Sequence, residues 1–258
     1  MTLLRSSDRR GYFGVASMLT LLLLGAGTGV MSPVAEAAGA DEWISLLEGA
    51  SLANWQEDQT GWSLASGVKL HPDAPDQLIS EPGDGVLISN GDAVNLYSRQ
   101  NFQDVELKCE FFIPRDSNSG VKLNGLYEIQ IRDTHDMKDL TGDMCGGVYP
   151  RAKQEPSYEH IDDGVAPMEN AAKPAGEWQT LQLTFYSPRF DAAGKKIADA
   201  RFEHVMLNGR EIHKQVDLHY PTGAAWNTMP EVPRGPLMLQ GDHGLVAFRG
   251  IQVRPLAK

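Results

Sequence analysis

The sequence has little helical periodicity and little positive charge. No stretch longer than two turns repeats its apolar residues at helical spacing, and there is no internal repeat and no low-complexity tract. These absences exclude a mainly helical or repeat architecture. Asp and Glu number 34 against 23 Lys and Arg, a formal net charge of −11 at pH 7. Such an acidic surface argues against nucleic acid or an anionic membrane as a partner, and it says little about a neutral sugar.

Cysteine is also scarce. Cys109 and Cys145 are the two cysteines, so the chain can form at most one disulfide within itself, and export would allow them to pair. Cys109, however, shares a predicted strand face with Val105, Leu107 and Phe111. A buried free thiol is therefore at least as well supported as a disulfide.

Long apolar runs are confined to residues 15–30, which follow three arginines and precede the small-x-small sequence Ala35-Glu36-Ala37. This order predicts a secretory signal peptide at residues 1–37, although Ala38-Gly39-Ala40 offers a second cleavage site. An uncleaved membrane anchor is the alternative, for which the run is short. No cysteine follows the run, so a lipoprotein anchor is not expected. The mature protein is predicted to be periplasmic or secreted.

The export route stays open between the general secretory and the twin-arginine pathways. Residues 9–13, RRGYF, resemble a twin-arginine signal, but Asp8 and Gly14 depart from its usual pattern. Cleavage after Ala37 leaves 221 of the 258 residues. The lost piece carries three arginines against Asp8 and Glu36, so the net charge moves from −11 to about −12. Residues 38–258 are long enough for one sizeable core and are predicted to form a single domain.

Many short segments alternate between apolar and polar residues, which is typical of half-buried strands. The clearest is residues 105–113, and Asn-Gly pairs at 124–125 and 208–209 predict hairpins. A short helix is expected at residues 42–47, and loops are expected at 71–85, 134–177 and 221–236. Trp43, Trp55 and Trp178 are interpreted as core residues. The fold class predicted is all-β, a sandwich or barrel. The further strands are expected at 62–66, 68–70, 85–89, 95–98, 127–132, 146–149, 177–187, 201–207, 210–218, 235–240 and 245–254.

The strand at residues 127–132 carries the strongest functional signal. Alternation turns its three apolar side chains to the core and sets Glu128, Gln130 and Arg132 in a row on the other face. Asp133 and His135 follow directly. Sandwich glucanases that retain configuration use two carboxylates about 5 Å apart, one as nucleophile and one as acid. These enzymes commonly have acids at the first, third and sixth places of such a strand run. Here the middle place holds an amide, which weakens that chemistry, although a β-bulge could still turn Asp133 toward Glu128.

Several motifs, in this order along the chain, resemble the 3-keto-disaccharide hydrolase family over nearly all of residues 42–256. They are Asn118-Ser-Gly with YEIQIRD at 127–133, CGGVY at 145–149, GEW at 176–178, and GPLMLQGDHG at 235–244 running into FRGI at 248–251. The resemblance implies a jelly-roll sandwich of the concanavalin type whose concave sheet binds sugar. It also implies cleavage of glycosides already oxidised at carbon 3.

A ketone at carbon 3 acidifies the hydrogen on carbon 2, so a general base can remove it and the substituent on carbon 1 can leave; water then adds back. For this chemistry we expect His135 as base, Glu128 as acid or base, and Arg132 or a metal ion at the enolate oxygen. Asp133 is the remaining catalytic candidate. Asp133 and His135, with Asp136 and Asp139 nearby, are also candidate metal ligands, but no ligand-spacing motif distinguishes them from a solvated acidic turn.

The predicted substrate-binding set is spread over the family motifs and comprises Asn118, Gln130, Arg132, Tyr149, Gln240, His243 and Arg249. Each also has a structural interpretation: Asn118 can cap a turn, Tyr149 can belong to the core, and Arg249 can form an ion pair at the core's rim. Two other functions remain open, a carbohydrate-binding module without turnover and a conventional endo-acting glycosidase. The ligand expected in each case is a carbohydrate.

Overall fold

A computed structural model describes residues 42–257 of the chain. The signal peptide predicted at residues 1–37 lies outside the described residues and stays a prediction. Within 42–257 no helix is both long enough and apolar enough to cross a membrane.

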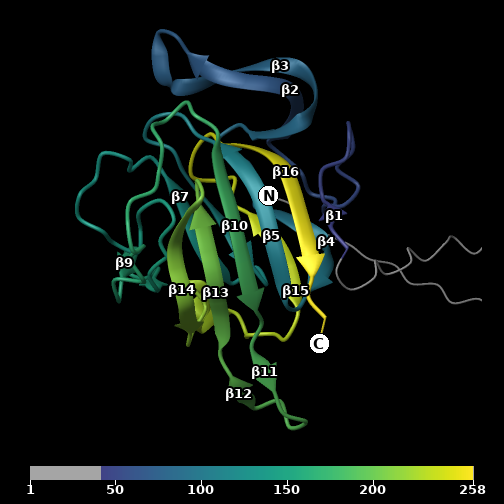
Figure 1. Cartoon of the computed structure of the whole chain (residues 1–258), viewed down its shortest axis with the longest axis vertical. Helices are drawn as coiled ribbons and strands as arrows, with labels where there is room; N and C mark the ends of the chain where they lie inside the picture. The colour runs from purple at the N-terminus through teal and green to yellow at the C-terminus, as the bar shows by residue number, and fades with distance from the viewer. Residues whose placement is uncertain (1–41, 258) are drawn as a thin grey trace, which may run out of the picture. The chain divides into compact units, whose positions relative to one another are not determined.

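Two antiparallel sheets pack face to face, which confirms the predicted all-β jelly-roll sandwich. The larger sheet has the order β14-β13-β10-β5-β16-β3-β2, with β1 paired to β16. Its strands are β1 (Ile44–Ser45), β2 (Trp62–His71), β3 (Ala74–Ser89), β5 (Val105–Phe112), β10 (Gln179–Tyr186), β13 (Ala200–Leu207), β14 (Arg210–Leu218) and β16 (Ala247–Pro255). In Figure 1 most of these strands face the viewer, with the smaller sheet behind them.

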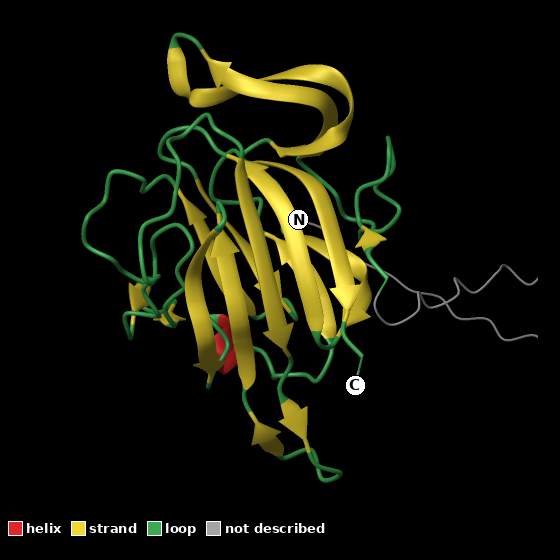
Figure 2. Cartoon of the chain, in the orientation of Figure 1, coloured by secondary structure: helices red, strands yellow, loops and turns green. Residues whose placement is uncertain are grey.

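The smaller sheet has the order β4-β15-β6-β7, and it is the sheet that matters for function. Its strands are β4 (Leu96–Phe102), β6 (Asn118–Leu123), β7 (Tyr127–Arg132) and β15 (Gly235–Leu239). Short pairs, β8 (Ala152–Lys153) with β9 (Glu159–His160) and β11 (Arg189–Phe190) with β12 (Lys196–Ala198), lie outside both sheets. The helix α1 (Ala225–Thr228), red in Figure 2, is a single turn.

The core lies between the sheets because alternate residues of each strand point inward. In β5 the side chains of Val105, Leu107, Cys109 and Phe111 are buried, as the period of two predicts. On β7 the inward residues are Tyr127, Ile129 and Ile131, all almost fully buried. Both Asn-Gly hairpins are present, because Asn124 and Asn208 take the left-handed conformation and a glycine follows each. Glu128 is therefore held on the outward face of β7.

Three expectations about local structure are wrong. Residues 146–149 form no strand, because Val148 makes only isolated bridges, to Ile129 and Val165. Residues 42–47 contain no helix, because Ile44 pairs with Val253 on β16. Residues 71–85 are mostly strand, since β3 runs through them and pairs with a continuous β2. Pro82 is accommodated there at a register shift, where Ala65 pairs with both Pro82 and Val86. The hairpin's apolar side chains, among them Leu70 and Leu78, pack into a second small core with Trp178.

The three tryptophans expected in the core differ in burial. Trp55 is fully buried, as predicted. Trp178 is half-buried against Phe112. Trp43 departs from the expectation, because it lies on the outer surface of the larger sheet with its ring 4.1 Å from Lys108 Nζ. The short strand β1 holds it there beside β16.

Neither cysteine is in a disulfide: Cys109 and Cys145 are both buried free thiols. Burial raises the pKa of the Cys109 thiol to about 12 and that of Cys145 to about 11. At neutral pH both stay protonated and unreactive. Their role is therefore that of small apolar core residues.

Residues 145–149 lie along the free edge of β7. Gly146 N donates to Gln130 O at 2.8 Å, Gln130 N donates to Gly147 O at 2.9 Å, and Tyr149 N donates to Glu128 O at 3.2 Å. Beneath this segment, His213 Nε2 lies 2.7 Å from Gly146 O. The sequence pattern Cys-Gly-Gly-Val-Tyr thus positions Tyr149 beside the outward face of β7.

His213 should make stability depend on pH below neutrality. Burial lowers the pKa of His213, although its hydrogen bond to Gly146 opposes the shift. Above about pH 6.5 the ring is neutral in both the folded and the unfolded states. As pH falls below that value the unfolded chain takes up a proton that the buried ring resists, so stability falls. We expect a loss on the order of 1 kcal/mol between pH 7 and 5, measured by urea unfolding.

The matched variant for this test is His213→Gln, whose amide can still donate to Gly146 O. Its stability should change less between pH 7 and 5 than that of the wild type. An equal slope in the two proteins would show that another group causes the dependence.

Candidate functional site

A cavity of about 370 Å³ lies over the outward face of the smaller sheet, within the range of small-ligand sites. Its floor is formed by β6, β7, β15 and the start of β4, and its walls come from loops and from α1, which are green and red in Figure 2. The side chains that line it include Asn95, Tyr97, Asn118, Lys122, Glu128, Gln130, Tyr149, Tyr158, Met229, Met238, Gln240, Asp242 and His243. The same strands that build the core therefore build the floor of the cavity with their alternate residues.

Strand register places the floor residues in rows across the sheet. Tyr97 pairs with Met238, Met238 with Lys122, and Lys122 with Glu128. Cross-strand neighbours of this kind have Cβ atoms roughly 5 Å apart, so their side chains are in reach of one another. These four residues form the first cross-strand row, whose side chains are, in order, an aromatic ring, a thioether, an ammonium group and a carboxylate.

The centre of the floor is the ion pair of Lys122 and Glu128. Lys122 Nζ lies 2.9 Å from Glu128 Oε2, and the two side chains are only 15% and 3% exposed. Burial lowers the pKa of the Lys122 ammonium, but the adjacent Glu128 carboxylate outweighs it and the net shift is upward. Lys122 is therefore held as a cation at the floor of the cavity.

Gly120 makes room for this carboxylate. It lies opposite Gln130 on β7, and any Cβ added to it would collide with Glu128 Oε1. Glu128 therefore leans over the backbone of β6, where a larger residue would displace it. This close approach gives a physical reason for glycine in the Asn-Ser-Gly motif.

A second group of floor residues carries amides. Gln130 Nε2 donates to Asn118 Oδ1 at 3.2 Å, and Gln240 N donates to Gly120 O at 2.9 Å. Gln130 is 2% exposed, and its Oε1 has no hydrogen-bond partner among residues 42–257. A buried acceptor of this kind carries a cost that a ligand hydroxyl would remove. The amides are thus suited to bind the hydroxyl groups of a sugar.

His243 and Asp242 form one rim of the cavity. His243 Nδ1 lies 2.6 Å from Asp242 Oδ1 and 3.3 Å from Gln240 Nε2, while Asn95 Nδ2 donates to the other Asp242 oxygen at 3.3 Å. Because Nδ1 is occupied by the carboxylate, Nε2 is the nitrogen available for proton transfer. The rim therefore holds an imidazole oriented by an acid.

Tyr149 forms part of the opposite wall within a group of three side chains. Its hydroxyl accepts from the Tyr158 hydroxyl at 3.0 Å and lies 3.0 Å from His160 Nε2. Burial, and then the hydrogen bond with Tyr158, raises the pKa of the Tyr149 phenol. Tyr149 is consequently a protonated donor at neutral pH, with a neighbouring imidazole that can return a proton to it.

The structure brings together six of the residues predicted from sequence: Asn118, Glu128, Gln130, Tyr149, Gln240 and His243 all line this cavity. Arg132, Asp133, His135 and Arg249 do not. Arg132 pairs with Asp143 at 2.8 Å, because β7 ends there and the loop bends away. Arg249 lies on the larger sheet, paired with Glu110 and stacked on Trp178 at 4.0 Å.

His135 lies in the turn after β7, with Nε2 2.8 Å from Asp136 and Nδ1 3.7 Å from Asp133. Asp133 instead accepts from the backbone N–H of Asp116. Within the described part of the chain, no group of three or more His, Cys, Asp or Glu side chains is arranged to hold a metal ion. The predicted metal ligands Asp133 and His135 are therefore not part of such a group.

Sequence reasoning missed Lys122, Tyr97, Asp242 and Tyr158. Lys122 had a usable signal, because it alternates with Val121 and Leu123 and stands two residues before the Asn-Gly turn, opposite Glu128. Asp242 lies inside the motif that supplied Gln240 and His243. Tyr158 comes from the long loop, where no periodicity relates a residue to the sheet.

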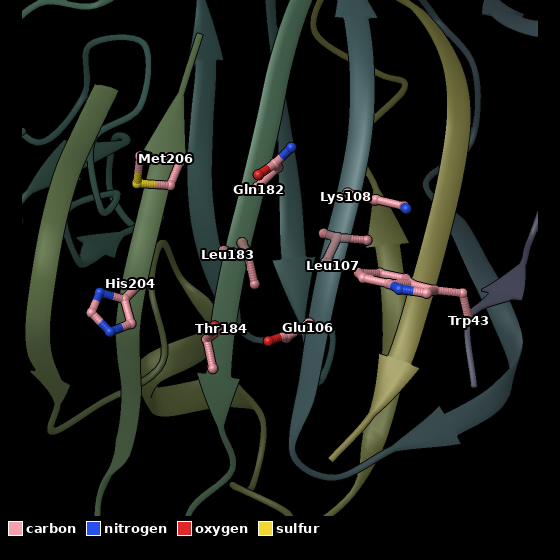
Figure 3. A pocket seen from close by; sticks show the side chains of 9 residues that line it. All are labelled: Trp43, Glu106, Leu107, Lys108, Gln182, Leu183, Thr184, His204 and Met206. Atoms are coloured by element: carbon pink, nitrogen blue, oxygen red, sulfur yellow. The ribbon is translucent and has the colours of Figure 1, made fainter. Parts of the chain in front are cut away.

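A second hollow lies on the outer face of the larger sheet and is shown in Figure 3. It measures about 340 Å³ and is lined by outward residues of β5, β10 and β13 together with Trp43. Its acid Glu106 is paired with Arg254 of the neighbouring strand. Its outward side chains mix the Trp43 ring and Met206 with Lys108, Gln182, Thr184 and His204, and none of the ten site residues predicted from sequence lines it. The first cavity is therefore the candidate active site.

A sandwich with such a cavity, lined by amides and acid/base groups, has the features of a carbohydrate-active protein. Residues 42–254 match the family described as the 3-keto-alpha-glucoside-1,2-lyase-like domain, and the chain belongs to this family. The membership confirms the resemblance read from the motifs and supports a carbohydrate-active function with a carbohydrate ligand.

Solved structures share the fold. A candidate glycosyl hydrolase from Parabacteroides distasonis superposes with a TM-score of 0.59 at 24% identity, over 83% of this chain and 84% of that one. A second from the same organism has a TM-score of 0.55 at 20% identity, over 84% of this chain and all of that one (100%). At these identities the likeness is one of fold alone. None of the curated proteins matches the sequence.

Proposed function

We propose that this protein cleaves 3-keto-glycosides by removing the proton on carbon 2 and eliminating the substituent on carbon 1. The observation that carries the proposal is the pair of Lys122 and Glu128, 2.9 Å apart on the cavity floor. The proton to be removed and the ketone oxygen are borne by neighbouring carbon atoms. A base and a cation must therefore stand side by side, which this pair provides.

In this mechanism the Glu128 carboxylate takes the proton from carbon 2, and the electron pair moves onto the ketone oxygen as an enolate. The Lys122 ammonium stabilises the negative charge there. Because the pKa of Lys122 is shifted upward, it acts as a charge and not as an amine nucleophile. These roles replace those expected for His135 and Arg132, which lie outside the cavity.

Collapse of the enolate forms the double bond between carbons 1 and 2 and breaks the bond from carbon 1 to the leaving oxygen. That oxygen needs a proton, and we assign its donation to Tyr149 at the cavity wall or His243 at its rim. Water then adds across the double bond, with hydroxyl going to carbon 1 and a proton to carbon 2, to give the 3-keto-sugar. The amides of Asn118, Gln130 and Gln240 would hold the ring hydroxyls during these steps.

The test is incubation of the protein in D₂O with 3-keto-trehalose and, separately, with trehalose. We expect glucose release from the oxidised sugar alone, with deuterium on carbon 2 of the released 3-keto-glucose. The label distinguishes elimination from direct hydrolysis, because only the elimination breaks the carbon–hydrogen bond. A reaction without enzyme corrects for spontaneous exchange.

Two outcomes would contradict the proposal. Release without label would indicate a conventional glycosidase. Binding without release would indicate a carbohydrate-binding module. A parallel reaction with a chelator shows whether a divalent ion takes part.

A further inference from the structure

The cavity over the smaller sheet has two chemically different parts. Asn118, Gln130, Gln240 and the Lys122–Glu128 pair make one part polar. The other part is lined by the ring of Tyr97 and the thioethers of Met229 and Met238, with the turn of α1 beside them. The nearest charged side chain along the cross-strand row is Lys122, which is the neighbour of Met238. We refer to Tyr97, Met229 and Met238 as the apolar wall.

The apolar wall adjoins the reacting pair directly. Met238 lies between Tyr97 and Lys122 in the first cross-strand row, and Glu128 ends that row. A group attached to carbon 1 of a sugar whose carbon 2 faces Glu128 can therefore extend over Met238 toward Tyr97 within the same cavity. Met238 is two strand spacings from Glu128 and Tyr97 is three, at about 5 Å each.

The ring of Tyr97 is left uncovered on the side of the β6–β7 turn. The residue next to it there is Gly125, and a Cβ at that position would stand 3.6 Å from Tyr97 Cε1. Any larger side chain would thus cover part of the ring. Met229 and Tyr158, which also line the cavity, are 48% and 52% exposed and are therefore open to a ligand.

This part of the cavity fits an aromatic ring better than a second sugar. Hydroxyl groups moved from water to a surface of thioethers and ring carbons lose hydrogen bonds that nothing there replaces. A flat apolar ring loses none, and it gains contact with the polarizable sulfur atoms and with the face of Tyr97. Two methionines also adapt their shape to rings of different substitution.

We propose that the apolar wall is a subsite for an aromatic aglycone, so that the preferred substrates are aryl glycosides and not disaccharides. The inference rests on the proposed function in one respect, which is that the group on carbon 1 is the part of the substrate that leaves. Binding at the subsite is independent of turnover and can be measured without it.

The test compares the binding of 4-nitrophenyl α-glucoside and of trehalose, both unoxidised and therefore not open to elimination, by titration calorimetry. We expect the aryl glucoside to bind about tenfold more tightly than trehalose. In Tyr97→Ala and in Met229→Ser that advantage should fall to about twofold or less, with trehalose affinity unchanged. Met229 is half exposed, so the second variant keeps the fold if the first does not.

Matched controls come from the hollow of Figure 3. Met206→Ala and Trp43→Ala remove the same kinds of side chain from the opposite outer face and should leave both affinities unchanged. Equal affinity of the two ligands in the wild type would overturn the proposal. So would loss of aryl binding in Trp43→Ala with retention in Tyr97→Ala.

Turnover of the matching 3-keto-glycosides separates the two proposals. Aryl preference in binding without any cleavage would contradict the proposed function and leave the subsite standing. Cleavage of both substrates with equal kcat/KM and no aryl preference in binding would contradict the subsite alone.

Discussion

Glu128→Gln is expected to lower kcat for a 3-keto-glycoside by about 10³-fold, because the amide cannot accept the proton from carbon 2. Gln is nearly isosteric with Glu and can still accept a hydrogen bond from Lys122, so binding should persist. The measurement is kcat and KM with 3-keto-trehalose, together with calorimetric binding of trehalose. A loss of kcat with little change in affinity is the expected pattern.

Glu110→Gln is the matched control for this variant. Glu110 is also a paired strand carboxylate, bound by Arg249 at 2.8 Å, but it lies on the larger sheet. Its substitution should leave kcat unchanged. If Glu128→Gln retained wild-type turnover, the assignment of Glu128 as the base would have to be abandoned.

Lys122→Met should reduce both activity and stability. The enolate loses its cation, for which we expect a fall in kcat of about 10²–10³-fold. Glu128 also loses its partner while it stays buried, and an unpaired buried charge costs about 3–5 kcal/mol. The free energy of unfolding in urea and the turnover of 3-keto-trehalose are the two measurements.

The double variant Lys122→Met/Glu128→Gln separates the two effects. It contains no unpaired charge, so most of the lost stability should return while activity stays absent. If stability recovers and turnover does not, the pair of Lys122 and Glu128 both stabilises the fold and takes part in catalysis. If the double variant were no more stable than Lys122→Met, the loss would come from packing of the lysine chain instead.

The fold class was predictable because the period-two alternation of residues 105–113 and 127–132 is strong, and because two Asn-Gly pairs fix their hairpins. The hairpin of β2 and β3 was not, since its Pro, Asp and Gly residues are typical of loops and its pairing depends on contact with Trp178. Alternation describes a strand's two faces, but it contains no information on which distant segment covers one of them.

The same limit applies to the site. Glu128, Gln130 and Asn118 were found because they share two adjacent strands, and Gln240 and His243 because a motif contains them. His135 was favoured for its intrinsic chemistry and its closeness in sequence to Glu128, but β7 ends at Arg132 and the turn beyond leads away from the cavity. Lys122 belongs to the site through its cross-strand pairing with Glu128, which follows from the Asn-Gly hairpin but not from the alternation of either strand alone.

The strand that carries Glu128 is the last in its sheet, and residues 145–149 occupy its outer edge. An open strand edge is a template on which another polypeptide can add itself, and it would offer that template within the substrate cavity's own floor. The Cys-Gly-Gly-Val-Tyr segment closes the edge with three backbone hydrogen bonds. The segment that positions Tyr149 at the cavity therefore also prevents the edge of β7, beside Glu128, from pairing with a strand of another molecule.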